Sequence, residues 1–182
     1  MKKIAIFTLF AAAALTFSSC EQESLDPLPE KVEGMYVILN VQQATLEFDN
    51  FETTAFRGTL TNPSSNIVRY ELFVRRRNPN GVSTSNTKLL ETITSFPHQL
   101  EITPAKIAAA LEVPVTELAV GDVYRFIGYS YDASGTKTGY NNLSAVLRTT
   151  PTMKQGYKWS ANAAAVINPG DPFNIYTPFS NN

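Results

Sequence analysis

The chain of 182 residues has very few of the side chains that most often carry chemistry, with one cysteine, one histidine and one tryptophan. A single cysteine excludes an internal disulfide, so the fold has to be stabilised by its apolar core. The single histidine, His98, excludes a zinc site made of several histidines and cysteines. Its neighbour Pro97 indicates a turn, where we expect His98 to be exposed to solvent.

Motifs for covalent catalysis and phosphate binding are also missing. There is no Gly-x-Ser-x-Gly elbow and no glycine loop suited to phosphate, and His98 is the only imidazole that could activate a nucleophile. The carboxylates considered for glycoside hydrolysis are Glu91, Glu101, Glu112 and Glu117. Nothing in their spacing requires a pair. Asp132, Asn141 and Asn142 lack the spaced acidic pattern of a calcium loop. We therefore expect a protein that is not an enzyme, with no catalytic residue, metal or cofactor.

An excess of charge of one sign is absent as well. The chain has 15 basic and 16 acidic side chains, a net charge of −1 at pH 7. No stripe of lysines and arginines runs along any segment. A nucleic-acid partner is therefore not expected.

The one long apolar run lies at the N-terminus. Two lysines precede an apolar stretch over residues 4–15, and small side chains stand just before Cys20. A positive start, a short apolar core and small residues before a cleavage point are typical of a secretory signal. The stretch is too short for a permanent membrane-spanning helix, which needs about 20 apolar residues. We predict that residues 1–19 are a signal peptide.

The segment that ends at Cys20 resembles the lipobox of bacterial lipoproteins. In that family the cysteine is acylated, with palmitate as a typical acyl chain, and becomes the first residue of the mature protein. The segment departs from the family pattern at Phe17, where leucine is usual. Two or more acyl chains give stable anchoring to a membrane. The alternative is a soluble secreted protein with a free thiol at Cys20.

Residues 20–33 have the composition of a tether. They are acidic, contain two prolines and show no sustained apolar period. An acidic stretch directly after the cysteine also resembles the surface-export signal of Bacteroidetes-type lipoproteins. This resemblance implies a lipid-anchored protein of the outer membrane, exposed at the cell surface.

From Gly34 the sequence changes to short β-rich segments separated by turn residues. The clearest covers residues 67–76, where alternating apolar and polar side chains are typical of a half-buried strand. Thr103 and Pro104 are suited to the N-cap and first turn of a short helix, which we interpret as a lid on one edge of the domain. The other predicted strands cover residues 35–41, 45–48, 54–61, 88–94, 122–131 and 143–149.

These elements predict an all-β fold, an antiparallel β-sandwich over residues 34–151 with one short inserted helix. Residues 152–182 have a proline-rich end and no clear period. Two interpretations remain for them: an extended tail packed on the domain, or the start of a module that this chain does not complete.

Residues 118–126 resemble the tyrosine-corner segment of fibronectin type III domains. In that family a leucine, a turn with glycine and a tyrosine precede the penultimate strand, and here these residues are Leu118, Gly121 and Tyr124. The resemblance implies that the Tyr124 hydroxyl bonds to nearby backbone and fixes the corner. Residues 144–150, followed by Pro151, similarly resemble the last strand of the family. The implied fold is a fibronectin type III-like, or immunoglobulin-like, sandwich.

The combination of lipoprotein start, acidic tether and sandwich resembles the accessory lipoproteins of starch-utilisation-type glycan-uptake systems. The segment from Phe96 and Pro97 to Gly121 and Asp122 is also similar to a module of such lipoproteins. The resemblance implies a glycan-binding or scaffolding accessory. Its partners would be the membrane, through the lipid anchor, and either a polysaccharide or a co-expressed outer-membrane protein.

One face of the predicted sheet is the candidate contact surface. If Tyr124 faces the core, the alternation places Arg125, Tyr129 and Tyr131 outside, and the neighbouring strand adds Phe73 and Arg75. Flat aromatic rings can stack on sugars, while arginines and tyrosine hydroxyls supply hydrogen bonds.

The same face has two other interpretations, a protein interface or ordinary packing of aromatic residues between neighbouring strands. Trp159, in the C-terminal segment, is either the next candidate for a ligand contact or part of a tail that covers this face. The alternative function is therefore a structural or adhesive module that contacts another protein.

Overall fold

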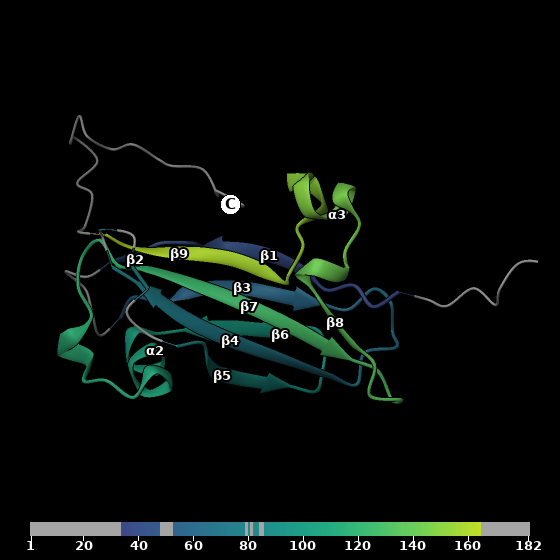
Figure 1. Cartoon of the computed structure of the whole chain (residues 1–182), viewed down its shortest axis with the longest axis horizontal. Coiled ribbons are helices and arrows are strands. Elements are labelled where there is room, and N and C mark those ends of the chain that lie inside the picture. Colours follow the sequence, from purple (N-terminus) through teal and green to yellow (C-terminus); the bar gives the residue numbers. More distant parts are fainter. Residues whose placement is uncertain (1–33, 48–52, 79, 81, 84–85, 165–182) are drawn as a thin grey trace, which may run out of the picture. The chain divides into compact units, whose positions relative to one another are not determined.

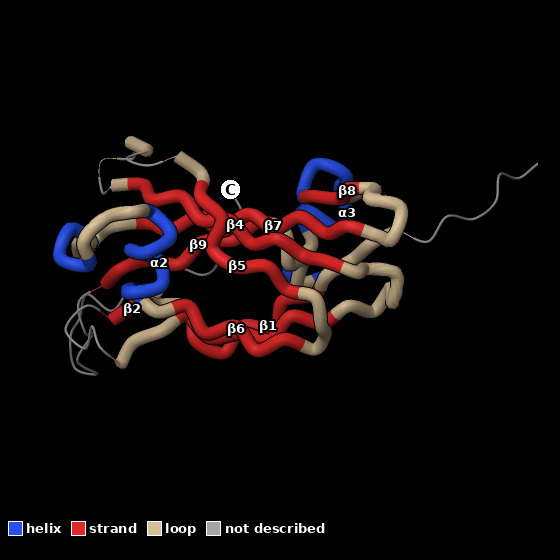
Figure 2. The backbone as a smooth tube through the Cα atoms, turned by 90° about the horizontal axis from the view of Figure 1, so that it is seen from below, coloured by secondary structure: helices blue, strands red, loops and turns tan. Residues whose placement is uncertain are grey.

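Two β-sheets lie in two layers and account for most of the fold (Figure 2). The structure is a computed structural model, and it describes residues 34–47, 53–78, 80, 82–83 and 86–164. The predicted signal over residues 1–19, Cys20, the tether and the last part of the predicted tail lie outside the described residues. The prediction of an all-β fold is confirmed.

The smaller sheet has the strand order β1-β3-β6 and the larger sheet the order β2-β9-β7-β4-β5 (Figure 1). All strand pairs are antiparallel except β2 with β9. The short strand β8 is not part of the order given above and pairs with β7. The smaller sheet consists of β1 (Ile38–Gln43), β3 (Phe56–Thr61) and β6 (His98–Ile102). The larger sheet consists of β2 (Leu46–Glu47), β4 (Arg69–Arg77), β5 (Lys88–Ile93), β7 (Val123–Tyr131), β8 (Lys137–Gly139) and β9 (Lys158–Ala164).

Three aromatic rings join the two sheets in the core. Phe56 comes from β3 in the smaller sheet, whereas Phe126 and Trp159 come from β7 and β9 in the larger one. The ring centroids are 5.8 Å apart for Phe56 and Phe126, 6.2 Å for Phe56 and Trp159, and 5.6 Å for Phe126 and Trp159. Rings at this spacing contribute about 0.5–1.5 kcal/mol per pair beyond the area they bury.

The inserted helix forms where the sequence predicts it. It is α2 (Pro104–Leu111), and the hydroxyl oxygen of Thr103 accepts a hydrogen bond from the backbone N–H of Lys106 at 3.2 Å. Its buried face packs on β4 and β5. Within the described part of the chain, no helix has the length and apolar character needed to cross a membrane.

The end of the predicted sandwich is wrong in two respects. Residues 143–149 are not the last strand, because Ala145–Thr149 forms the short helix α3, which Ser144 caps through a hydrogen bond from the Leu147 N–H at 3.4 Å. The domain also does not end at Pro151. The described part of the predicted tail contains β9, which pairs with β7 inside the larger sheet.

The turn before β7 contains the predicted corner residues Leu118, Gly121 and Tyr124. Asp122 N–H donates to the Ala119 carbonyl at 3.1 Å, and Gly121 has φ of +88°, the conformation that favours glycine in a type II turn. The prediction that the Tyr124 hydroxyl bonds to nearby backbone is wrong. Its hydroxyl donates instead to the carboxylate of Asp122 at 3.2 Å.

The Asp122 carboxylate is the centre of a buried polar cluster. The same oxygen, Oδ2, accepts from Arg76 Nε at 2.8 Å and from the Ala119 N–H at 2.9 Å. Burial, followed by the charge of Asp122, raises the pKa of Tyr124, so the hydroxyl stays protonated and continues to donate. Two backbone bonds attach this corner to β9: the Ala163 N–H donates to the Asp122 carbonyl, and the Gly121 N–H donates to the Ala163 carbonyl.

Replacing Asp122 by alanine should lower the free energy of unfolding by about 3 kcal/mol. The substitution removes the acceptor shared by the Arg76 Nε, the Tyr124 hydroxyl and the Ala119 N–H, and breaking a buried ion pair costs about 3–5 kcal/mol. Glu101→Ala is the matched control, because the Arg57–Glu101 pair is exposed at both ends and such pairs contribute less than about 1 kcal/mol. Urea unfolding of both variants checks this, and equal losses would contradict a special role for Asp122.

The single tryptophan reports directly on the position of β9. Trp159 is 2 % exposed, so the native protein should emit at the short wavelength of a buried indole and resist quenching by iodide. Trp159→Ala should lower the unfolding free energy by about 3–5 kcal/mol because it leaves a cavity, and Trp159→Phe should cost less because it keeps the stack with Phe56 and Phe126. A native emission that matches the unfolded chain would refute the placement of β9.

Candidate functional site

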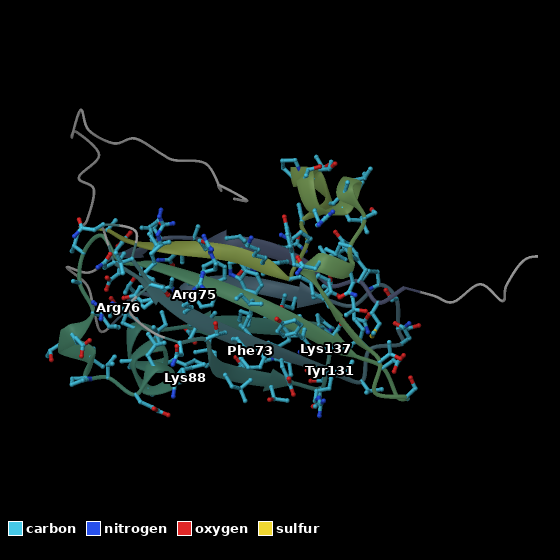
Figure 3. The ribbon with its side chains drawn as sticks, viewed as in Figure 1. Phe73, Arg75, Arg76, Lys88, Tyr131 and Lys137 are labelled. Carbon is cyan, nitrogen blue, oxygen red and sulfur yellow. The ribbon has the colours of Figure 1, made fainter. Side chains whose placement is uncertain are left out.

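The outer face of the larger sheet carries the residues that the sequence selects. Strands β4 and β7 pair over nine residues, from Arg69 opposite Tyr131 to Arg77 opposite Val123. Alternation along both strands buries one face and leaves the other partly open to solvent. Figure 3 shows Arg75, Phe73 and Tyr131 along this face. The predicted contact residues brought together here are Phe73, Arg75, Arg125, Tyr129 and Tyr131.

Tyr129 is fixed in place by its neighbours. Its ring meets the ring of Phe73 edge to face, with centroids 5.7 Å apart. On β8, Gly139 lies directly opposite Tyr129, and a Cβ at that position would lie 2.7 Å from the tyrosine ring. Glycine is therefore required at position 139 for the ring to lie across the strand.

Cationic side chains cover the rings of Tyr129 and Tyr131, which the sequence predicts to be available for stacking on a sugar. Lys137 Nζ lies 3.7 Å from the ring centroid of Tyr129, and Arg69 Cζ lies 4.2 Å from that of Tyr131. The Tyr131 hydroxyl donates to Glu71 at 2.8 Å, and burial together with Glu71 raises the pKa of Tyr131. A sugar that stacks on these rings would first have to displace a cation.

Next to the rings, the outer face is hollowed into a groove of about 340 Å³. Its floor is the sheet, and one wall is the 3-10 turn Tyr140–Asn142, which directly follows β8. We call this feature the basic groove. The residues that line it are Arg75, Arg125, Ile127, Tyr129, Gly139, Tyr140, Asn141, Asn142 and Lys158.

Positive charge is concentrated in the basic groove. Arg75 on β4 lies directly opposite Arg125 on β7, and Lys158 on β9 lies opposite Ile127 on β7. Burial, followed by the charges of Arg75 and Arg77, lowers the pKa of Arg125. None of the described residues that line the groove is a carboxylate.

Sequence reasoning missed the part of the groove that the later chain supplies, namely Tyr140, the two asparagines and Lys158. Lys158 reaches the groove only because β9 pairs with β7, whereas the sequence predicts for residues 152–182 either a tail packed on the domain or the start of an incomplete module. The alternation of residues 158–164, which buries Trp159, Ala161 and Ala163, is the signal that could have found this strand.

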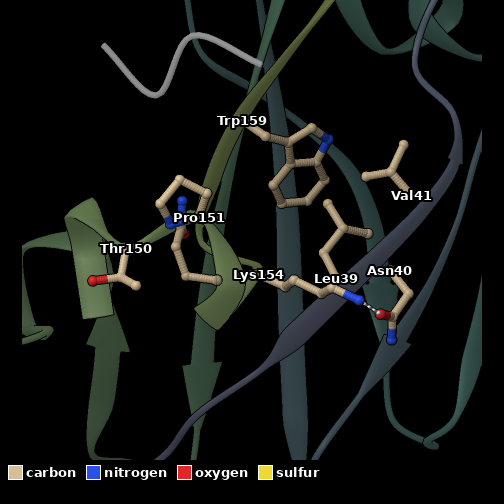
Figure 4. A pocket seen from close by; sticks show the side chains of 8 residues that line it. Leu39, Asn40, Val41, Thr150, Pro151, Lys154 and Trp159 are labelled. Carbon is tan, nitrogen blue, oxygen red and sulfur yellow. Dashed lines mark hydrogen bonds between the residues drawn. The ribbon is translucent and has the colours of Figure 1, made fainter. Parts of the chain in front are cut away.

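Trp159 does not contact the outer face, so its prediction as a ligand contact on that face is wrong. It lines a different cavity, of about 320 Å³, between β1 and the turn that precedes β9 (Figure 4). Lys154 Nζ donates to the side-chain oxygen of Asn40 at 2.9 Å beside this cavity. The indole Nε1 of Trp159 is buried without a hydrogen-bond partner among the described residues.

His98 and the four candidate glutamates each lie close to an oppositely charged or hydrogen-bonding side chain. His98 is the first residue of β6, and its Nε2 lies 3.1 Å from Glu91, so the prediction of an exposed loop histidine is wrong. Glu91 also accepts from Lys106 at 2.6 Å. The other three glutamates each lie within ion-pair distance of a cation, in the pairs Arg57–Glu101, Lys88–Glu112 and Arg76–Glu117. Within the described ranges, no cluster of three or more histidines, cysteines and acids is arranged to hold a metal ion.

No family model matches this sequence, and no curated protein matches it either.

Proposed function

We propose that this protein is a non-enzymatic, lipid-anchored surface lipoprotein that binds glycan as an accessory of an outer-membrane uptake system. The observation that carries the proposal is the basic groove, which places tyrosine, asparagine and arginine side chains around one concave surface. Its volume of about 340 Å³ falls within the range of about 300–1,000 Å³ typical of small-molecule sites.

The groove offers the kinds of contact that a sugar needs. Asn141 and Asn142 are exposed amides that can hydrogen-bond to hydroxyl groups, and the half-buried ring of Tyr140 supplies an apolar surface with a polar tip. Lys158 Nζ lies 4.9 Å from the ring centroid of Tyr140, which keeps this cation beside the ring. A sugar unit placed there would contact a ring, two amides and a positive charge.

A fibronectin type III-like sandwich is the proposed fold family. The main strands alternate between sheets, since β1 and β3 share one sheet, β4 and β5 the other, and β6 then returns to the first. Connections of this Greek-key kind are typical of immunoglobulin-like and fibronectin-like domains. Tyr124, at the start of β7, supports the same proposal, although its acceptor is a side chain.

The absence of catalysis is part of the proposal. The described residues of the groove include no carboxylate that could protonate a glycosidic oxygen or act as a nucleophile, and most glycoside hydrolases need two. The second candidate function is a contact with another protein, and the exposure of Leu89 favours it. Leu89 on β5 is 49 % exposed and lies opposite Phe73, so apolar side chains adjoin the outer face.

Anchoring is testable at Cys20. Cells that express the wild-type chain should carry it in the membrane fraction and incorporate labelled palmitate into it, because acyl chains supply the hydrophobic contact with the bilayer. Cys20→Ser should abolish the label and move the protein to the soluble fraction. Label that persists in Cys20→Ser, or a wild-type protein without label, would refute the anchor.

Glycan binding is testable by affinity electrophoresis of the mature chain carrying Cys20→Ser, through gels that contain neutral or acidic polysaccharides. We expect the protein to be retarded by at least one polysaccharide and Tyr140→Ala to lose most of that retardation, because Tyr140 lines the basic groove.

Tyr131→Ala is the matched control, since Tyr131 lies on the same face and is not among the groove residues. Retardation that depends on Tyr131 and not on Tyr140 would move the site to the aromatic rings. A protein that no polysaccharide retards would overturn the proposed function, and crosslinking to surface proteins would then test the second candidate.

A further inference from the structure

Two arginines face each other in the middle of the larger sheet. Arg75 and Arg125 are directly opposite on β4 and β7, and like charges at such positions destabilise a sheet. Arg125 also lies within the electrostatic influence of Arg77, and partial burial removes some of the water that would screen these charges. A fold selected for stability alone would gain by placing a neutral residue at one of these positions.

The Arg75 guanidinium has unused hydrogen-bonding capacity. Its Nε is buried and has no hydrogen-bond partner among the described residues. A buried donor without an acceptor costs free energy, and a ligand oxygen that reaches it would recover that cost. Arg75 lines the basic groove, so an anionic group bound in the groove would lie beside this guanidinium.

The surrounding residues of the groove lining add a third cation. Lys158 lines the groove from β9, and the described residues of the groove lining include no carboxylate. This concentration of positive charge occurs in a chain whose net charge is −1. It is therefore a local feature of the groove and does not follow from composition.

We propose that the basic groove selects acidic polysaccharides, whose carboxylate or sulfate groups bind between Arg75, Arg125 and Lys158 while the sugar rings contact the wall over residues 140–142. This inference rests on the proposed glycan-binding function and names its ligand class. Guanidinium groups bind planar carboxylates and sulfates through paired, charge-assisted hydrogen bonds. Neutral sugars offer no group that would offset the repulsion between the two arginines.

The test measures binding of the mature chain carrying Cys20→Ser to matched polymers by affinity electrophoresis and calorimetry. The acidic probes are polygalacturonate, hyaluronate and chondroitin sulfate. Fully methyl-esterified polygalacturonate and amylopectin are the neutral probes, and the ester keeps the sugar while it removes the charge. We expect binding to one or more acidic polymers, loss of binding to the ester, and weaker binding as salt rises.

Three variants locate the site. Arg75→Gln and Lys158→Gln should each weaken binding of the acidic polymer about tenfold or more, because each removes a charge-assisted contact. Lys154→Gln removes an exposed cation from another part of the domain and should change the affinity less than about twofold. Arg75→Gln should also melt at the same or a higher temperature than the wild type, since it removes the repulsion from Arg125. That result separates lost binding from lost folding.

The other outcomes overturn the inference in distinguishable ways. Equal binding of polygalacturonate and its methyl ester, or binding of amylopectin alone, would refute acidic selectivity while glycan binding stands. Loss of affinity in Lys154→Gln equal to that in Lys158→Gln would indicate diffuse attraction without a site. If inorganic sulfate displaces the polymer as effectively as an equal concentration of sugar-bound sulfate, the groove is a simple anion site that does not recognise the sugar. No binding to any polymer would remove the proposed function together with the inference.

Discussion

The uninterrupted pairing of β4 with β7 is the constraint on which the rest of the domain depends. Nine residues of each strand face each other in one register, so the same alternation decides which side chains enter the core and which form the outer face. Phe126 reaches the aromatic core for the same reason that Arg125 reaches the basic groove. A shift by one residue would exchange the two faces of a strand, so the core and the groove can only be formed together.

Three consecutive arginines at the end of β4 show how differently the fold treats positive charge on its two faces. Arg76 points inward, where the buried Asp122 carboxylate accepts from it at 2.8 Å and the backbone carbonyl of Glu117 accepts at 2.7 Å. Arg75 and Arg77 point outward, and Arg125 lies directly opposite Arg75 on the neighbouring strand. The inward charge is compensated, and a buried charge without its partner would be strongly destabilising. The outward charges of Arg75 and Arg125 are brought close to one another, and this proximity is part of the case for the proposed anionic ligand.

The sequence predicts elements where local signals and burial agree, and fails where they conflict. Strands β1, β3, β4, β5 and β7 and the helix capped by Thr103 lie close to their predicted ranges, whereas β6 is not among the predicted strands although it buries Leu100 and Ile102. Strand β9 was missed because two of its three inward residues are alanines, which give a weak apolar signal next to Trp159. Residues 143–149 carry a better apolar pattern, yet Ser144 caps a helix there and Val146 remains 61 % exposed. The candidate site was incomplete for the same reason, since Lys158 belongs to the missed strand.

Under the proposed function, the strands and the connecting turn of the outer face would have different tasks in binding. The charged floor stands on β4, β7 and β9, whose hydrogen-bonded register fixes the spacing of the cations before any ligand arrives, and this lowers the entropy lost on binding. The wall over residues 140–142 belongs to a short connection between β8 and α3, where changes of sequence disturb the core least. Cations cover the rings of Tyr129 and Tyr131, so these rings serve mainly to hold the floor in place. Under the proposed function, the sheet would therefore set the charge that a ligand must carry, and the wall would select the sugar that carries it.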